Sequence, residues 1–204
     1  MTLLLATSNA HKVQEVKETL PGYDIVIPRD LSLDFDPEEH ADSFIGNALI
    51  KAQALYAMMA NHPGIPRVPI LADDSGLCVD ALSGGPGIYS SRYGSKPGGP
   101  KLDAATRNDY LLAALTGAKD RSAHYVCAMV LFFETDRFLV AQEIWKGRLA
   151  HKPSAGTGGF GYDPIFEIDD EGTTAADISA EEKHRVSHRG KALARIRGFL
   201  QADK

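Results

Sequence analysis

The sequence has few cysteines, no long apolar run and no surplus of basic residues, and each absence argues against a class of protein. Its two cysteines, Cys78 and Cys127, lie in apolar, strand-like runs without metal-ligand spacing, so we expect buried, reduced thiols. No apolar run is long enough to cross a bilayer. The first residues, MTLLLATSN, lack the basic region and cleavage pattern of a signal peptide. We therefore expect a soluble, cytoplasmic protein with no membrane partner.

The charge balance argues against a nucleic-acid polymer as partner. Acidic residues outnumber basic ones, 27 against 22, and the formal net charge is −5. A polyanion needs a basic surface, although a small anion needs only a local basic pocket. With 204 residues, 44% of them hydrophobic, the chain is long enough for one core or for two lobes that share a sheet. We expect residues 1–204 to form a single domain.

Apolar periodicity predicts strands that alternate with helices and a hairpin late in the chain. The predicted strands are Thr2–Ala6, Asp24–Pro28, Val68–Ala72, Leu77–Leu82, Ala123–Glu134, Arg137–Leu149 and Tyr162–Phe166. The predicted helices are Val13–Leu20, Asp42–Asn61, Leu102–Leu115 and Ala180–Gln201, and the predicted loops are Asp30–Ala41 and Ser83–Pro100. This order indicates an α/β fold with a mixed sheet.

The most informative segment is the glycine-rich run 156–166, Gly-Thr-Gly-Gly-Phe-Gly-Tyr-Asp-Pro-Ile-Phe. Glycine lets the backbone adopt positive φ and approach a ligand closely. Phe160 and Tyr162 need either a core to enter or a flat surface on which to stack. The segment is therefore either a mobile loop that closes over a planar ligand, or a connection whose aromatic side chains only anchor it.

Polar residues gather where the first predicted strand meets the first helix. Thr7–Lys12 contains hydroxyls, an amide and a lysine beside a helix N-terminus, an arrangement that suits phosphate. The alternative is ordinary N-capping by Ser8 or Asn9, with Lys12 in solvent.

Two adjacent carboxylates, Asp73 and Asp74, follow an apolar strand directly and precede Ser75-Gly76. They would repel each other unless a cation or hydrogen bonds offset the charge, and hard oxygen ligands suit Mg²⁺. The alternative is an Asp-rich turn whose side chains cap the local backbone. We favour the metal site, because the apolar run Leu77–Leu82 indicates an enclosed turn.

A basic set, Lys183, His188 and Arg189, lies near the C-terminus. A turn at 187–189 would let the three side chains converge. The alternative is the solvated, charged start of a helix.

Taken together, these segments resemble one family, the non-canonical purine NTP pyrophosphatases (inosine/xanthosine triphosphatases, the HAM1-like family). Residues 6–12 resemble its T-x-N-x-x-K motif, and 44–52 resemble F-x-E-N-A-x-x-K-A. Residues 72–80 and 85–93 resemble A-D-D-S-G-L-x-V-D and G-x-P-G-x-Y-S-x-R-Y. The glycine-rich loop and Ser187-His188-Arg189 complete the match, which covers almost the whole chain.

The resemblance implies hydrolysis of ITP, dITP or XTP to the monophosphate and pyrophosphate, with Mg²⁺ as cofactor. It also implies two lobes around a long, strongly twisted mixed sheet with flanking helices, a central substrate cleft and a homodimer. A related house-cleaning pyrophosphatase for pyrimidine or modified nucleotides, and a nucleotide-binding regulator with weak catalysis, remain as alternatives.

The resemblance also assigns roles to residues. Asp74 would hold the metal and act as base toward water, with Asp73 beside it and Lys12 as a fixed positive charge. Glu38 or Glu39 would be a further metal ligand. The substrate-binding residues would be Thr7, Ser8, Asn9, Ala10, His11, Lys12, Lys51, Ser75, Phe160, Gly161, Tyr162, Asp163, Lys183, His188 and Arg189.

Two features of this assignment concern specificity and a departure from the family pattern. His188 and Arg189 are donors that would favour a 6-oxo purine over adenine, and Phe160 would stack on the base. The family commonly has Glu where this chain has Gly46. If that acid is needed, Glu38 or Glu39 must replace it.

Overall fold

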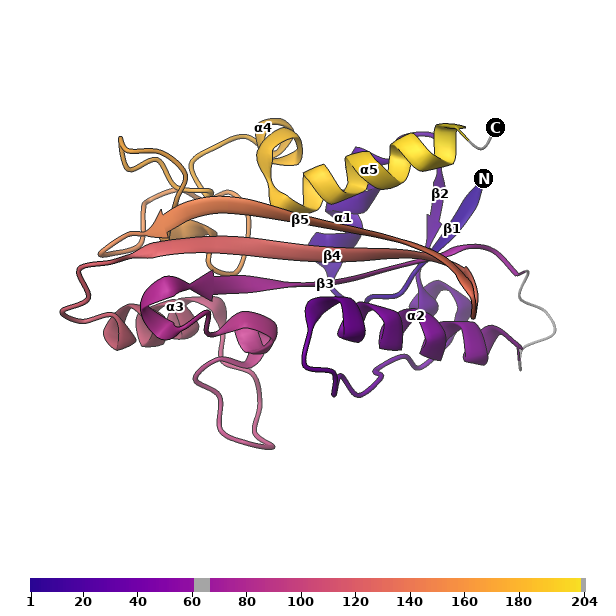
Figure 1. Cartoon of the computed structure of the whole chain (residues 1–204), viewed down its shortest axis with the longest axis horizontal. Coiled ribbons are helices and arrows are strands. Elements are labelled where there is room, and N and C mark those ends of the chain that lie inside the picture. The colour runs from indigo at the N-terminus through magenta and orange to yellow at the C-terminus, as the bar shows by residue number, and fades with distance from the viewer. Residues whose placement is uncertain (61–66, 203–204) are drawn as a thin grey trace. The chain divides into compact units, whose positions relative to one another are not determined.

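The computed structural model describes residues 1–60 and 67–202, which form an α/β fold (Figure 1). Its helices are α1 (Ala10–Thr19), α2 (Phe44–Ala60), α3 (Ala104–Ala114), α4 (Ala180–Val186) and α5 (His188–Ala202). Its strands are β1 (Thr2–Leu5), β2 (Asp24–Val26), β3 (Ile70–Val79), β4 (Ser122–Glu134), β5 (Arg137–Leu149) and β6 (Phe166–Glu167). Among the described helices, none has both the length and the apolarity that a membrane span requires.

The six strands form one mixed sheet in the order β2-β1-β3-β4-β5-β6. β1 runs parallel to β2 and β3, with Leu4 beside Val26 on one side and Ile70 on the other. β5 runs antiparallel to β6. The predicted α/β class, mixed sheet and late hairpin of β4 and β5 are therefore confirmed.

The chain divides into two compact units, and each is described by itself. Unit 1 consists of Met1–Asp74, Cys127–Glu143 and His188–Lys204, and unit 2 of Ser75–Val126 and Ile144–Ser187. The chain passes from one unit to the other within β3, β4 and β5 and between α4 and α5. The assignment of residues 1–204 to a single domain stays a prediction.

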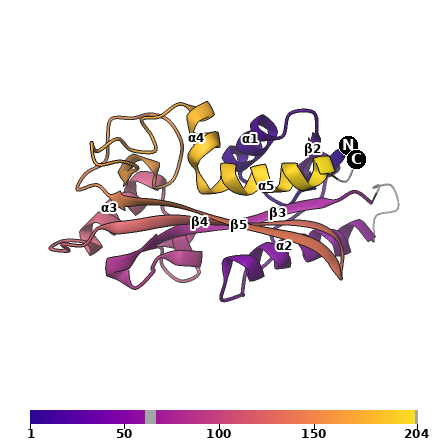
Figure 2. The ribbon, with the colours of Figure 1, turned by 45° about the horizontal axis from the view of Figure 1, so that its top comes forward.

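Unit 1 buries both faces of its strands. Helices α1 and α5 cover one face and α2 covers the other (Figures 1 and 2). Since successive strand residues point to opposite faces, Leu3 and Leu71 pack with α1 and α5. Leu4 and Ala72 pack with α2. The near-continuous apolar runs of β1 and β3 are the pattern expected for parallel strands covered on both sides.

Unit 2 has a core of its own between α3, its strand segments and the chain that follows β5. This core includes Leu77, Val79, Leu111, Leu115, Tyr125, Trp145 and Phe166. The Tyr125 and Phe166 rings lie 4.6 Å apart between centroids. The aromatic contacts fix the end of β5, from which the glycine-rich loop departs.

Two predictions about the strands differ from the structure. The sequence predicts separate strands at Val68–Ala72 and Leu77–Leu82, but β3 runs without interruption from Ile70 to Val79. Its aspartates remain in the strand because lysines and an arginine pair with them. Of the predicted strand Tyr162–Phe166, only Phe166 lies in a strand, as the first residue of β6. Asp163–Ile165 forms a 3-10 turn instead, because the Asp163 carboxylate accepts the Phe160 N–H and closes the turn.

The predicted helix Ala180–Gln201 is divided in two. Ser187 is extended, with φ −73° and ψ 160°, and ends α4 before α5 begins at His188. The predicted turn at 187–189 is thus reduced to one residue. The predicted helix from Asp42 begins at Phe44 in the structure, and its predicted last residue, Asn61, lies outside the described residues.

Candidate functional site

The N-terminus of α1 is capped by Asn9. Its Oδ1 accepts hydrogen bonds from the N–H groups of His11 (3.0 Å) and Lys12 (3.3 Å), while Thr7 Oγ1 accepts from the Asn9 N–H at 3.2 Å. Ser8, Ala10 and His11 are exposed. The capping interpretation holds for Asn9, but Lys12 is not in solvent, since its side chain is only 14% exposed.

Asp73 and Asp74 point to opposite faces of β3. This follows from strand geometry, and the two carboxylates accordingly have different partners. Asp73 shares its face with Leu71, beneath α1 and α5, and Asp74 shares its face with Ala72, against α2. The repulsion expected for adjacent carboxylates is thereby reduced, and each is paired separately.

The Asp73 carboxylate lies between two cations. Lys12 Nζ is 2.8 Å from Oδ2, and Arg189 Nε is 3.5 Å from the same oxygen. Arg189 also donates to the Glu15 carboxylate. Burial favours the protonated acid, but the charges of Lys12, Arg189 and Lys51 outweigh it and hold the pKa of Asp73 below its ordinary value. Asp73 is thus a fixed anion.

The Asp74 carboxylate belongs to a second network on the α2 side. Lys51 Nζ lies 3.1 Å from its Oδ1, and Asn47 Nδ2 donates to its Oδ2 at 3.3 Å. Lys51 Nζ also lies 3.2 Å from Oε2 of Glu39. Burial raises the pKa of Asp74; Lys51 and Lys12 oppose the rise and Glu39 adds to it, with a net increase. Asp74 is therefore a better proton acceptor than an exposed aspartate.

The charge on Lys51 is secured by the acids around it. Burial works against the ammonium ion, but Asp74, Asp73 and Glu39 outweigh it and raise the pKa of Lys51. The side chain therefore stays positive on the face of β3 that carries Asp74.

The donor set on this face fits a hard divalent cation. Asp74 and Glu39 bring two carboxylates to one Lys51 ammonium ion, and Mg²⁺ commonly takes one or two protein carboxylates together with phosphate oxygens and water. Within residues 1–60 and 67–202, no group of three or more His, Cys, Asp and Glu side chains could hold a metal ion. Any cation here must therefore complete its shell with water or substrate oxygens.

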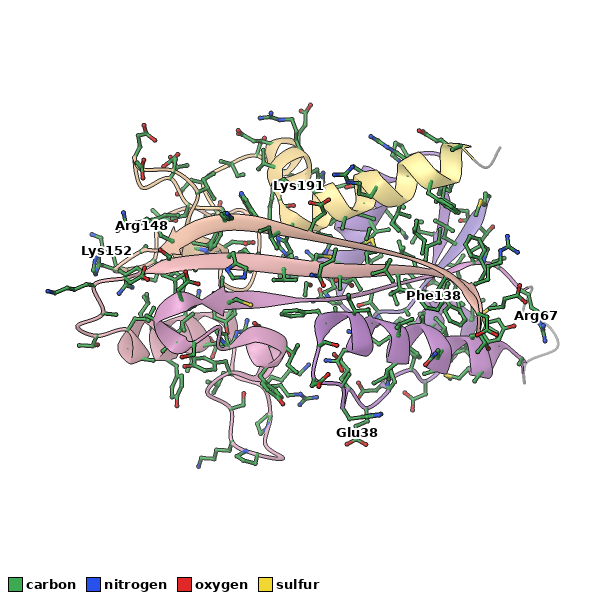
Figure 3. All side chains as sticks on the ribbon, viewed as in Figure 1. Glu38, Arg67, Phe138, Arg148, Lys152 and Lys191 are labelled. Atoms are coloured by element: carbon green, nitrogen blue, oxygen red, sulfur yellow. The ribbon has the colours of Figure 1, made fainter. Side chains whose placement is uncertain are left out.

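Only one member of the predicted glutamate pair lies in this network. Glu39 contacts Lys51, whereas Glu38 is exposed and projects away from α2 in Figure 3. Its backbone carbonyl accepts a hydrogen bond from the His40 ring at 3.2 Å.

In unit 2, Asp163 organises the glycine-rich loop. Its carboxylate accepts from the Phe160 N–H at 2.6 Å, from Lys183 Nζ at 2.7 Å and from the Tyr125 hydroxyl at 3.2 Å. Gly159 has φ +68°, and a Cβ there would collide with the Asp163 carboxylate. The loop therefore needs glycine at this position for two independent reasons.

The two loop aromatics have different roles. Tyr162 is buried, donates to the Ser90 carbonyl at 2.8 Å and lies under the Arg107 guanidinium, so it anchors the loop. The Phe160 ring is half-buried, and the Lys183 ammonium lies 4.9 Å from its centroid. Phe160 thus combines an aromatic face with an adjacent positive charge.

A hollow of about 380 Å³ lies between this loop and the start of α3. Asn108 lines this hollow together with residues 156–161 of the loop, Phe160 among them. Asn108 Nδ2 also donates to the Gly161 carbonyl at 3.1 Å. The volume is within the range of small-molecule pockets.

The C-terminal basic residues are divided between the two units. Lys183 pairs with Asp163 in unit 2, and Arg189 pairs with Asp73 and Glu15 in unit 1. His188 is the first residue of α5 and is 4% exposed. The alternative interpretation, in which these residues form the solvated start of a helix, is wrong because all three side chains are buried. Ser75 is half-buried within β3.

Four residues that contact predicted site residues were not themselves predicted to belong to the site. Asn47 bonds the Asp74 carboxylate, although only its place in the F-x-E-N-A-like motif drew attention to it. Glu15, which holds Arg189, lies three residues after Lys12 and hence on the same side of α1. The spacing of Lys12 and Glu15 therefore indicates from the sequence that the two side chains are neighbours. No comparable spacing relates Asn108 or Tyr125 to a predicted site residue.

Comparison with known proteins shows the family to which the chain belongs. Residues 3–199 match the model of the Ham1 family. A dITP/XTP pyrophosphatase of Treponema denticola is 46% identical and aligns over 100% of both chains. Another, from Thioalkalivibrio sulfidiphilus, is 45% identical over 98% of this chain and 99% of its own. The structure of a HAM1 protein from Coxiella burnetii has a TM-score of 0.84 at 35% identity, covering 99% of each chain. This chain belongs to the Ham1 family.

Proposed function

We propose that this protein hydrolyses non-canonical purine nucleoside triphosphates, such as dITP and XTP, to the monophosphate and pyrophosphate. The observation that carries the proposal is the Asp74 network, in which a buried carboxylate shares a lysine with a second carboxylate. Full-length relatives named dITP/XTP pyrophosphatases support the substrate class.

In this proposal Asp74 and Glu39 hold Mg²⁺. The ion would neutralise phosphate charge and lower the pKa of a bound water. Asp74, held in place by Lys51 and Asn47, would orient the attacking water and accept its proton as general base. Lys51 supplies fixed positive charge where negative charge develops.

The α1 N-terminus is proposed to bind phosphate. A phosphate there would replace Asn9 as acceptor for the N–H groups of His11 and Lys12, with Ser8 and Thr7 as further donors. Lys12 would contact phosphate while Asp73 holds its ammonium in place.

The loop of unit 2 is proposed to take the base. Phe160 offers an aromatic face for stacking, and the Lys183–Asp163 pair keeps the loop backbone in place. Because Asp163 already accepts three hydrogen bonds, we assign it to positioning the loop. His188 and Arg189 belong to unit 1, and their role as donors to a 6-oxo group stays a prediction from the family resemblance.

A product assay tests the proposal. The protein is incubated with dITP, XTP, dUTP, TTP or GTP, with Mg²⁺ or with EDTA, and the products are separated by ion exchange. We expect monophosphate and pyrophosphate from dITP and XTP, only with Mg²⁺. Orthophosphate as the first product would reject the reaction, and a preference for dUTP or TTP would reject the substrate class.

The cytoplasmic location and the homodimer also remain predictions. Size-exclusion chromatography with light scattering measures the oligomeric state directly.

A further inference from the structure

The segment before α2 is tied into the Asp74 network at two points. The Ala41 N–H donates to Oδ1 of Asn47 at 3.0 Å, while Nδ2 of the same side chain donates to Asp74. Two residues earlier, Glu39 reaches Lys51, which also contacts Asp74. Residues 39–43, here called the arm, thus join a closed ring of contacts with Asn47, Lys51 and Asp74.

The arm packs directly on α2 at Gly46. A Cβ at this position would lie 2.6 Å from Cβ of Ala41 and 3.0 Å from Oγ of Ser43. The Ser43 hydroxyl accepts the Gly46 N–H at 3.2 Å. Since the Ala41 Cβ is fixed to the backbone, any side chain at position 46 must push the arm away from the helix.

We infer that Gly46 is a positioning residue: its missing side chain lets the arm dock on α2, and the docked arm sets Glu39 beside Lys51 and Asp74 as the second carboxylate for the divalent cation. The inference rests on the proposed function. The second carboxylate ligand is then Glu39 and not Glu38. Residue 46 affects cation binding only through the position of the arm.

A side chain at position 46 should displace Glu39 but leave Asp74 in place. Displacing Ala41 breaks its bond to Asn47, so the arm loses the contact that fixes its distance from Asp74. Glu39 is largely exposed, and its ion pair with Lys51 holds it at the site. Its placement therefore depends on how the arm is seated, whereas Asp74 is held within β3.

A double-mutant cycle with Mn²⁺ alone tests this without turnover. Mn²⁺ binding is measured by calorimetry, with no nucleotide present, for wild type, Gly46→Ala, Glu39→Gln and the double variant. Gly46→Ala should weaken binding by about ten- to a hundredfold, as loss of an outer-shell partner does at metal sites, and Glu39→Gln should weaken it at least as much. In the Glu39→Gln background, Gly46→Ala should have no further effect.

Two controls accompany the cycle. Asp42→Asn removes an exposed acid from the same arm and should leave Mn²⁺ affinity unchanged. Circular dichroism should show that Gly46→Ala keeps its helix content, because alanine favours helix over glycine.

Three results would overturn the inference: undetectable Mn²⁺ binding by wild type, wild-type affinity in Glu39→Gln or Gly46→Ala, or additive losses in the double variant. None of these three results tests the proposed function, which is tested by the release of pyrophosphate from dITP by the wild-type protein.

Discussion

Removing the charge of Asp73 should destabilise the protein strongly although the side chain keeps its shape. Asp73→Asn leaves Lys12 and Arg189, whose side chains are 14% and 5% exposed, without the anion that lies 2.8 and 3.5 Å from them. At an effective dielectric constant of about 20, these contacts correspond to about 6 and 5 kcal/mol of gross attraction. Desolvation of the carboxylate cancels much of this.

The net effect is therefore smaller than the gross attraction. Loss of one partner from a buried pair costs about 3–5 kcal/mol. We expect the lower end, because Arg189 keeps Glu15 and Lys12 is near solvent. A loss of about 3 kcal/mol would lower Tm by about 6–12 °C in a chain of this length.

The assay is urea unfolding in EDTA at several pH values, with Asp136→Asn in the exposed β4–β5 turn as control. The folded-state pKa of Asp73 is lowered, so its contribution is fully present above the unfolded value of about 3.9. It is lost as pH falls from there through the folded pKa. The difference between wild type and Asp73→Asn should shrink only below about pH 4. A difference under about 1 kcal/mol at pH 7, or one equal to that of the control, would refute the reasoning.

Three further predictions concern other parts of the molecule. Lys51→Met should reduce kcat/KM for pyrophosphate release by about 10²- to 10³-fold, because it removes the cation shared by Asp74 and Glu39; unchanged kinetics would exclude that role. Gly159→Ala should lower the free energy of unfolding by more than Gly22→Ala, which also has positive φ but open space around it; equal losses of about 1–2 kcal/mol would mean that backbone strain alone acts. Burial, with the Asp73 charge adding to it, raises the pKa of Cys127 to about 12, so Ellman's reagent at pH 8 should label this thiol in urea and not in the native protein; rapid native labelling at Cys127 would contradict its burial.

The sequence predicted the elements most reliably where the pattern was long and local. The two strands of the β4–β5 hairpin were placed to within one residue, because two long strand-like runs joined by a two-residue turn leave few other structures. Prediction failed at the unbroken β3, where the pairing of two aspartates decides the structure. It also failed at Tyr162–Phe166, where one side chain closes a turn.

The candidate site was predicted in its residue types more than in its contacts. Motif resemblance drew attention to Asp74, Lys51 and the glutamate pair, and the structure brings three of these acids and bases together. The motif resemblance could not show which of Glu38 and Glu39 reaches Lys51, because that depends on how the arm rests on Gly46.

By itself the sequence determined the α/β class, the order of the elements and the kinds of side chain near each strand end, because these follow from local periodicity and composition. Only the tertiary structure decided which charges pair. Lys12 meets Asp73 across 61 positions, and Arg189 meets Glu15 across 174. Such partners are set by how helices lie on the two faces of a sheet. For the same reason, two adjacent aspartates of β3 enter separate networks, one holding a fixed anion and the other a candidate base.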